Sequence, residues 1–257
     1  MKFRGALVIA LAGTSLLAAE VVQRTLIVAG ARLFPSRRHR IFAAWQQRLA
    51  RLMLGIVRVA GGARFEDIPQ IPSSPGVLVM MNHQSLMDIP LVVRATRDSY
   101  PRIVTRDRYA RGKPLISHMV RLYQYPTVNP KAMTRADLDL LQQTAAESPV
   151  PIAIFPEGTR TRDGSISRFK RMGLRLILGA RKWEVWLVVA DGWWQAARLT
   201  DFVGNISKVR GRIRAVGPFS SPDPELDPET FIREMEDRMN SLLEELRKEH
   251  VDLAQMA

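Results

Sequence analysis

The sequence predicts an α/β fold: a mostly parallel sheet flanked by helices, with membrane-associating helices at the N-terminus and an amphipathic helix at the C-terminus. Three observations predict it. Beyond residue 60, short apolar runs alternate with helical patterns, as in sheets whose parallel strands are joined by helices. Before residue 60 the chain is largely apolar, with interspersed basic residues. Near the end, residues 227–250 carry an apolar stripe at helical spacing.

The composition limits the possible functions. A chain of 257 residues is long enough for one main domain, and the absence of cysteine excludes disulfides, thiolate metal sites and a cysteine nucleophile. With 38 Lys and Arg against 25 Asp and Glu, the formal charge of +13 favours an anionic partner. The basic residues are spread along the chain without the interleaved aromatic residues of a single-strand binder, so we do not expect nucleic acid as a partner.

The first 60 residues are the predicted membrane-associating segment. A basic start precedes an apolar stretch from Gly5 to Ala19, which has the shape of a secretory signal. Leu17 stands where cleavage requires a small residue, however, so we expect no cleavage. Residues 5–34 could cross the bilayer at a tilt, form a shallow hairpin or lie in the interface, and their charged residues disfavour a simple span. Residues 40–61 have the pattern of an interfacial helix or of a core helix with a basic solvated face.

The α/β domain is predicted to begin after this segment. Residues 61–76, rich in Gly, Pro and Ser, are expected to form an entry loop, so we divide the chain into a membrane-associating segment, 1–60, and an α/β domain, 61–257, that includes the C-terminal helix. Strands are expected in GVLVMMN, PRIVT, VPIAIFPEG, VWLVVADG and KVRGRIRAVGPF. Helices are expected from about Ser85, in TRADLDLLQQTAAES and in FKRMGLRLILGARK. The last helix, 227–250, begins with Asp227 as its N-cap.

A histidine and an aspartate follow the first expected strand. The run VLVMMNHQSLMD places His83 just beyond the strand and Asp88 within the first turn or so of the next helix. Ligands of open α/β sheets bind at the carboxyl ends of the strands. A carboxylate there can accept a hydrogen bond from one imidazole nitrogen and leave the other nitrogen as a proton acceptor. We therefore predict that His83 is a base oriented by Asp88, although a lone histidine in this position would more often be structural.

A second candidate site follows another apolar run. IAIFPEGTRTRDGS places Glu157, Gly158, Thr159 and Arg160 in consecutive positions. Arginine suits bidentate contact with phosphate, and glycine lets the backbone approach a ligand closely. Glu157 could hold a hydroxyl, position Arg160 or only brace the loop. Lys170 and the arginines around it add positive potential for an anionic substrate, with a solvated helix face as the alternative for Lys170.

The sequence offers no obvious activated nucleophile. It lacks the G-x-S-x-G elbow of many serine hydrolases, and Ser85 is too close to His83 along the chain to be well placed. The simpler interpretation is that the substrate brings the hydroxyl and that His83 removes its proton as it attacks an acyl thioester. Such an enzyme needs a base, an orienting carboxylate and an anion site, and the sequence provides candidates for all of these.

The two sites resemble the signatures of the 1-acylglycerol-3-phosphate acyltransferase family, the glycerolipid and lysophospholipid acyltransferases. NHQSLMD is similar to the family motif N-H-x-x-x-x-D, and FPEGTR is similar to its second signature, in the same order. RFKRMG and LVVADGWW are looser matches to later segments. The resemblance covers about residues 65–220, and the membrane-associating N-terminus is similar to that of the family as well.

The resemblance implies a function for each candidate residue. His83 would be the general base and Asp88 its partner, and the glycerol-phosphate site would comprise Glu157, Gly158, Thr159 and Arg160. The donor would be acyl-CoA or acyl-acyl carrier protein, the acceptor 1-acylglycerol-3-phosphate (lysophosphatidic acid) and the product phosphatidate, as in phospholipid biosynthesis. Helices at the N-terminus would hold the sheet on the membrane with its active site facing the cytoplasm. No metal or bound cofactor is implied.

Two departures from the family leave the acceptor open. Where the family often has an aromatic-β-Asp-Arg segment, this chain has YPTVNPKA with Asn129 and Lys131, and Leu187 replaces a proline that is usual in the fourth motif. Another lysophospholipid or an amino-acid-derived lyso-lipid therefore stays possible. Two other classes also stay open: a non-catalytic membrane-surface adaptor that binds lipid or acyl carrier protein, and a lipid hydrolase. An oriented base argues against the adaptor, because binding alone does not need one.

Overall fold

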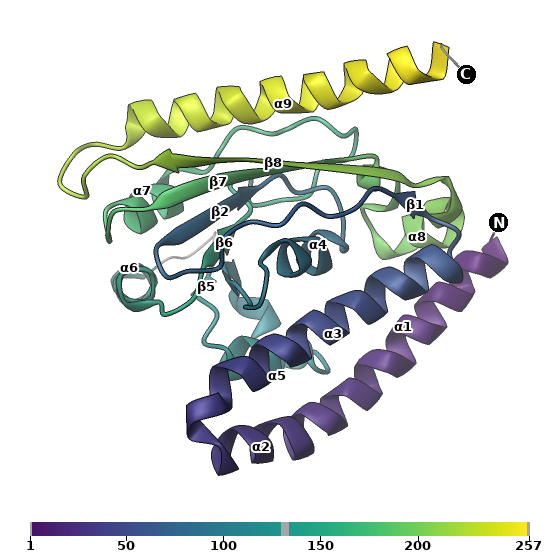
Figure 1. Ribbon diagram of the computed structural model, residues 1–257, viewed down its shortest axis with the longest axis horizontal. Helices are drawn as coiled ribbons and strands as arrows, with labels where there is room; N and C mark the ends of the chain where they lie inside the picture. Colours follow the sequence, from purple (N-terminus) through teal and green to yellow (C-terminus); the bar gives the residue numbers. More distant parts are fainter. Residues whose placement is uncertain (1, 130–133, 256–257) are drawn as a thin grey trace.

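The computed structural model describes residues 2–129 and 134–255. Figure 1 shows a sheet with helices on both faces, and a pair of long helices, α1 and α3, on one side of the molecule. The helices are α1 (Lys2–Val22), α2 (Val28–Leu33), α3 (Arg38–Val59), α4 (Asp88–Ala95), α5 (Ile116–Leu122), α6 (Arg135–Glu147), α7 (Arg171–Leu178), α8 (Leu199–Asn205) and α9 (Glu229–Gln255). The strands are β1 (Arg64–Phe65), β2 (Val77–Met81), β3 (Arg102–Ile103), β4 (Thr105–Arg106), β5 (Thr127–Val128), β6 (Ile152–Ile154), β7 (Glu184–Asp191) and β8 (Arg210–Ser220).

The main sheet has six strands in the order β1-β8-β7-β2-β6-β3. Strand β2 pairs in parallel with β6 and β7, and β3 pairs in parallel with β6. Strand β8 runs antiparallel to β7, because the segment between them holds only short helices and returns at the same edge of the sheet. Strands β4 and β5 form a separate parallel pair. The predicted fold class, a mostly parallel sheet flanked by helices, is confirmed.

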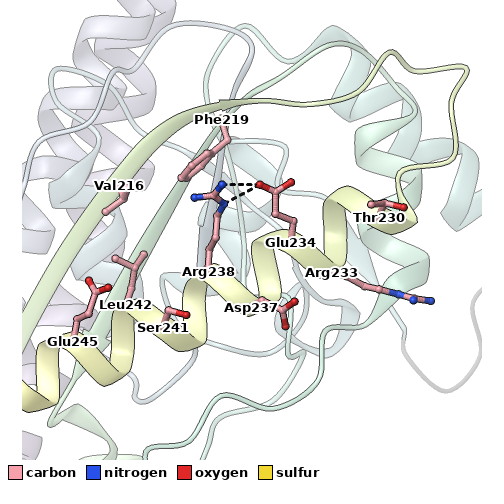
Figure 2. A pocket seen from close by; sticks show the side chains of 10 residues that line it. All are labelled: Val216, Phe219, Thr230, Arg233, Glu234, Asp237, Arg238, Ser241, Leu242 and Glu245. Atoms are coloured by element: carbon pink, nitrogen blue, oxygen red, sulfur yellow. Dashed lines mark hydrogen bonds and ion pairs between the residues drawn. The ribbon is translucent and has the colours of Figure 1, made fainter.

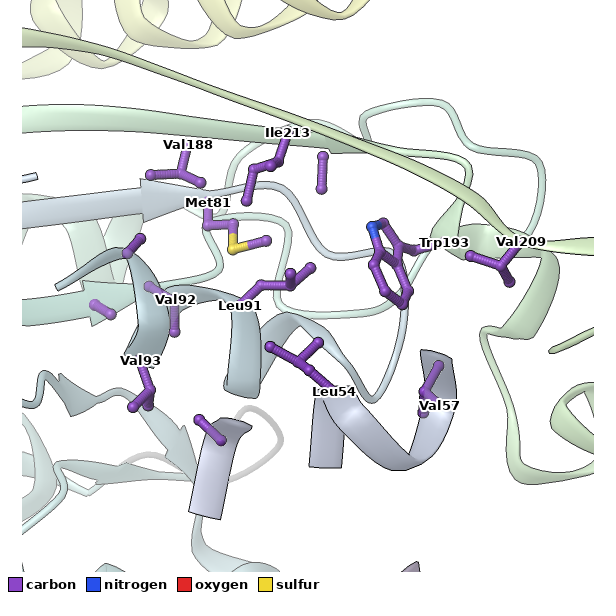
Figure 3. Packing of buried hydrophobic residues seen from close by; sticks show 14 of the residues in the cluster. Leu54, Val57, Met81, Leu91, Val92, Val93, Val188, Trp193, Val209 and Ile213 are labelled. Atoms are coloured by element: carbon purple, nitrogen blue, oxygen red, sulfur yellow. The ribbon is translucent and has the colours of Figure 1, made fainter. Parts of the chain in front are cut away.

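The central strand β2 is buried on both faces and contributes to two cores. Its odd-numbered side chains, from Val77 to Met81, lie in a core with residues of α3 and α4, and Figure 3 shows Met81 close to these helices. Its even-numbered side chains, Leu78 and Met80, lie in a core with residues of α6, α7 and α9. Burial on both faces explains why β2 is a continuous apolar run without polar alternation.

The C-terminal helix α9 covers one face of the sheet (Figure 1). It begins at Glu229, whose N–H donates to Oδ1 of Asp227 at 3.2 Å, so Asp227 caps the helix as predicted. Its buried stripe comprises Ile232, Met235, Met239, Leu243 and Leu246. A groove of about 600 Å³ lies between α9 and β8 near Val216 and Phe219 (Figure 2). These two residues pair with the beginning of β7, so the groove lies at the amino edge of the parallel strands.

The N-terminal helices have an apolar outer side and a specific inner side. Helix α1, a π-helical turn (Gln23–Ile27) and α2 form one stretch, Lys2–Leu33, which is long and apolar enough to cross a membrane. Its exposed apolar residues include Phe3, Leu7, Leu11, Leu17, Val21, Leu26 and Leu33. Gln23 is fully buried: its amide oxygen accepts from the indole of Trp45 at 2.9 Å, and its amide nitrogen lies 2.8 Å from Nδ1 of His118. The π-helical turn thus directs a polar side chain toward α3 and α5.

Helix α3 joins this segment to the α/β unit. It buries Phe42, Leu49, Met53, Leu54 and Val57, and it packs against α4. The amide nitrogen of Gln47 donates to the carbonyl oxygens of Val93 at 2.6 Å and Thr96 at 2.7 Å, at the end of α4. Carbonyls at the end of a helix have no partner within the helix, so Gln47 satisfies two of them. The helix that follows the candidate base is therefore held in place by the N-terminal segment.

Candidate active site

The two signature loops leave the same edge of the sheet. Strands β2 and β6 are parallel neighbours, with Met80 paired to Ile154, so the loops that follow them lie side by side. Asn82 fixes the start of the first loop: its Oδ1 accepts from the backbone N–H of Ala190, and its Nδ2 donates to the carbonyl of Ala190, both at 2.8 Å. A side chain thus continues the pairing of β2 with β7 beyond the end of the strand. We refer to residues 82–87 as the first loop and residues 155–170 as the second loop.

His83 and Asp88 are brought together as the sequence predicts. Nδ1 of His83 lies 2.7 Å from Oδ2 of Asp88, the first residue of α4. The same oxygen accepts the backbone N–H groups of Gln84 at 2.6 Å and Ser85 at 2.8 Å, and Asp88 is fully buried. Because a carboxylate only accepts hydrogen bonds, Nδ1 of the neutral imidazole carries the proton.

The remaining ring nitrogen of His83, Nε2, belongs to a partly exposed side chain. The His83 side chain is 20% exposed, and its ring stacks on that of Phe155 with 4.3 Å between the centroids. Within the described part of the chain, Nε2 forms no hydrogen bond. A neutral imidazole whose Nδ1 is protonated has its lone pair on Nε2, so this atom can accept a proton from a bound molecule.

Glu157 joins the two loops from inside the protein. It is buried, and its two oxygens accept the backbone N–H of His83 at 2.7 Å and that of Ser167 at 2.8 Å. Burial raises the pKa of Glu157 to about 7; the two N–H groups lower that pKa and the charge of Asp88 raises it. Of the three roles considered for Glu157, this geometry fits the brace.

Gly158 and Lys170 lie next to each other on the outer side of the second loop. Gly158 has a φ of +68°, a left-handed conformation that favours glycine, and a Cβ there would lie 3.4 Å from Cγ of Lys170. Its carbonyl oxygen accepts from Nη2 of Arg106 at 2.6 Å. Sequence reasoning missed Arg106. Its signal was a cation placed directly after the apolar run PRIVT, at the end of another strand of the α/β unit.

The other predicted residues of the second loop are placed differently. Arg160 donates from Nη1 to the carbonyl oxygen of Ala197 at 2.6 Å, so its guanidinium is directed toward the segment that follows β7. Thr159 is exposed on the loop. Asn129 follows β5, whereas Lys131 lies outside the described residues. The structure therefore brings Gly158, Lys170 and Arg106 together and anchors Arg160 beside them.

A polar network that sequence reasoning missed links the first loop to the C-terminal helix. The side chain of Gln84 accepts from the backbone N–H of Trp193 at 3.1 Å and contacts Oδ1 of Asp191 at 3.3 Å. Arg247 of α9 donates to the same oxygen at 3.0 Å and to the carbonyl oxygen of Gly164 at 2.9 Å. No local pattern identifies these partners, because Arg247 is more than 150 positions from Gln84 in the sequence.

Comparison with known proteins relates the middle of the chain to one family. The sequence model of the Acyltransferase family matches residues 62–185, which include both loops and make up just under half of the chain. The fold is similar to the crystal structure of PlsC, the 1-acyl-sn-glycerophosphate (LPA) acyltransferase from Thermotoga maritima, with a TM-score of 0.64 and 20% identity over 91% of this chain and 95% of that chain. Among proteins with curated descriptions, none matches the sequence significantly.

The arrangement around His83 provides the parts that acyl transfer needs. The site has an oriented imidazole with a free nitrogen, two loops fixed to each other, and exposed cations on the second loop. Among residues 2–129 and 134–255, no three His, Asp or Glu side chains are grouped so that they could hold a metal ion.

Proposed function

We propose that the protein transfers a fatty acyl group from acyl-CoA or acyl-acyl carrier protein to the free hydroxyl of a lyso-glycerolipid. The acceptor is 1-acylglycerol-3-phosphate and the product is phosphatidate. One observation carries the proposal: Nδ1 of His83 is bound by the buried carboxylate of Asp88 at 2.7 Å, and Nε2 is left without a partner in the described part of the chain. The match of residues 62–185 to the acyltransferase family model supports the reaction class.

The proposed reaction needs one base and no enzyme nucleophile. The acceptor hydroxyl approaches Nε2 of His83, and its oxygen attacks the thioester carbonyl carbon as Nε2 takes the proton. The carbon–sulfur bond then breaks, and the leaving thiolate takes the proton from the imidazolium. Asp88 stabilises the imidazolium that forms between these steps, because its carboxylate faces Nδ1 in a buried setting.

The proposed site for the acceptor phosphate is the exposed side of the second loop. Arg106 and Lys170 flank Gly158 there, and Arg160 lies further along the same loop. Arginine and lysine bind phosphate well, and the exposed backbone of a glycine lets a head group come close. The similar structure from Thermotoga maritima carries the name of an LPA acyltransferase, which supports a phosphate-bearing acceptor. Another lysophospholipid remains the alternative.

Membrane association is assigned to the outer side of the N-terminal helices. Their row of exposed apolar side chains, from Phe3 to Leu33, needs an apolar environment. A lipid surface supplies that environment as well as the lyso-lipid acceptor. We place the active site on the cytoplasmic side, where acyl thioesters are made.

An acceptor-panel assay tests the reaction. The purified protein is incubated with labelled acyl thioester, with and without 1-acylglycerol-3-phosphate and other lyso-lipids. Transfer requires the acceptor, a hydrolase releases free fatty acid without it, and an adaptor does neither. Labelled phosphatidate that appears only with the phosphate-bearing acceptor is the expected result.

Two histidine variants separate the role of the base from general damage. His83→Ala is expected to lower kcat about 10²–10⁴-fold, the usual contribution of a positioned base. His39→Ala is the matched control. His39 lies at the start of α3 and contacts Tyr100 and Ser99, which belong to neither signature loop. Full acyl transfer by a folded His83→Ala protein would disprove the assignment of the base.

A further inference from the structure

A second pocket lies beside the candidate active site and has no role in the reaction described so far. It has a volume of about 430 Å³ and is lined by Arg162, Trp194, Gln195, Ala197, Arg198, Asp201, Asn205 and Lys208. Trp194 and its neighbours follow the carboxyl end of β7, the same edge of the sheet that carries His83. The groove in Figure 2 lies at the opposite edge.

The pocket is positively charged. Arg162, Arg198 and Lys208 come from three separate segments, are exposed, and form no ion pair with the described part of the chain. Asp201 is the one carboxylate in the lining, and its Oδ2 accepts the backbone N–H of Arg198 at 2.9 Å. The lining therefore has three cations against one carboxylate, a net charge of +2, so the pocket suits a ligand with phosphate groups.

The pocket also offers a flat aromatic surface. Trp194 is partly exposed, and the amides of Gln195 and Asn205 lie in the same lining. Glycine at position 164 makes room for the indole, because a Cβ there would lie 2.7 Å from Cδ1 of Trp194. An indole ring stacks on a planar base, and side-chain amides can bond the edge of that base. A base together with phosphates is the chemistry of a nucleotide.

Two contacts connect the pocket to the reacting groups. The backbone N–H of Trp193, next to Trp194, donates to Gln84, the residue after His83. The carbonyl oxygen of Ala197, in the lining, accepts from Arg160 of the second loop. The pocket is therefore a neighbour of both loops.

We propose that this pocket binds the adenine nucleotide end of acyl-CoA, with Trp194 against the base and Arg162, Arg198 and Lys208 around the phosphates. The inference rests on the proposed acyl transfer and selects CoA as the form of the donor. The pantetheine arm then runs from the pocket to His83, where the thioester reacts. Acyl carrier protein has the same arm but no nucleotide, and a pocket of this size does not suit the docking of a whole protein.

Binding measurements test the pocket without turnover. The detergent-solubilised full chain is titrated calorimetrically with CoA, 3′-dephospho-CoA and phosphopantetheine. The variant Arg198→Ala/Lys208→Ala is compared with Lys182→Ala/Arg233→Ala, which removes the same charge from exposed positions at the other edge of the sheet. We expect the pocket variant to weaken CoA binding at least about tenfold and to leave phosphopantetheine binding unchanged, because charge-assisted hydrogen bonds are lost. The control variant is expected to bind CoA like the wild type.

The opposite results overturn the proposal. Equal CoA affinity in the pocket variant and the wild type means that the nucleotide does not bind in this pocket. Equal affinity of the wild type for CoA and phosphopantetheine means that the nucleotide contributes nothing to binding. A pocket variant with a raised KM for the lyso-lipid but not for acyl-CoA assigns the pocket to the acceptor. Acyl transfer from acyl-acyl carrier protein without CoA binding removes this inference but keeps the proposed function. CoA binding in the pocket without any acyl transfer keeps this inference and removes the proposed function.

Discussion

The first and second loops differ in how completely the protein holds them. In the first loop, Asn82, Gln84 and Ser85 are buried and hydrogen-bonded, and the adjoining Asp88 is buried as well. In the second loop Glu157 and Thr161 are buried and hydrogen-bonded, whereas Gly158, Thr159 and Lys170 are exposed. Proton transfer needs a fixed geometry, whereas recognition of a head group needs exposed polar groups. The difference suggests that the first loop determines the rate and the second loop selects the acceptor.

Substitution of the carboxylate in the first loop should have the largest effect. Asp88→Asn replaces an oxygen with an amide that must face either the imidazole or the backbone N–H groups of Gln84 and Ser85. We expect kcat to fall about 10²–10⁴-fold with little change in KM for either substrate. Steady-state kinetics on folded protein measure this. Asp98→Asn is the control, because the side chain of Asp98 is 91% exposed, and an equal loss in both variants would contradict the prediction.

The pH dependence of stability should reveal the role of Glu157, whose buried carboxyl group joins the two loops. Burial raises the pKa of Glu157 from 4.5 to about 7, so between these values the folded protein holds a proton that the unfolded chain has lost. This contribution to the free energy of unfolding therefore decreases as the pH rises from about 4.5 to 7 and is constant above pH 7. The decrease amounts to about 3 kcal/mol. Glutamine cannot titrate, so the free energy of unfolding of Glu157→Gln, measured with denaturant, should lack this decrease. Parallel curves of unfolding free energy against pH for the variant and the wild type would contradict the prediction.

Removal of Arg160 from the second loop should weaken acceptor binding and leave the chemical step unchanged. Arg160→Ala loses one charged donor, worth about 1.5–3 kcal/mol, and we expect KM for the acceptor to rise about 10- to 100-fold while kcat changes little. Arg160→Lys should recover only part of the loss, because lysine lacks the planar donor pair. Arg135→Ala, at the exposed start of α6, is the control. A fall in kcat at unchanged KM would place Arg160 with the first loop instead.

Removal of the hydrogen bonds that link the first loop to the C-terminal helix should have the smallest effect. Arg247→Met removes a half-exposed ion pair with Asp191 and a hydrogen bond to Gly164. We expect a loss of about 1 kcal/mol, a Tm lower by about 2–4 °C and a kcat reduced a few-fold. Arg238→Met, on the same helix beside Phe219, should lower the Tm to a similar extent without changing kcat. Thermal melts and kinetics of both variants measure the difference.

The sequence predicted the parts that depend on neighbours along the chain. His83 and Asp88 are five positions apart across a strand-to-helix junction, so a local rule was enough to place them together. The apolar runs predicted five strands of the main sheet, and the antiparallel direction of β8 was not predicted because only the return of the chain after β7 determines it. Arg106 was missed for the same reason: its contact with Gly158 spans 52 positions and depends on how the strands are ordered.

The burial of Gln23 has a practical consequence for handling the protein. The stretch Lys2–Leu33 exposes apolar side chains on one side and completes the protein interior with the other, where Gln23 accepts from the indole N–H of Trp45. Trimming this helix away would leave that donor and the ring of His118 without their partner and would uncover the apolar face of α3. We therefore expect polar replacements at exposed positions such as Leu7 and Leu11 to reduce the apolar surface while keeping the fold, which truncation would not do.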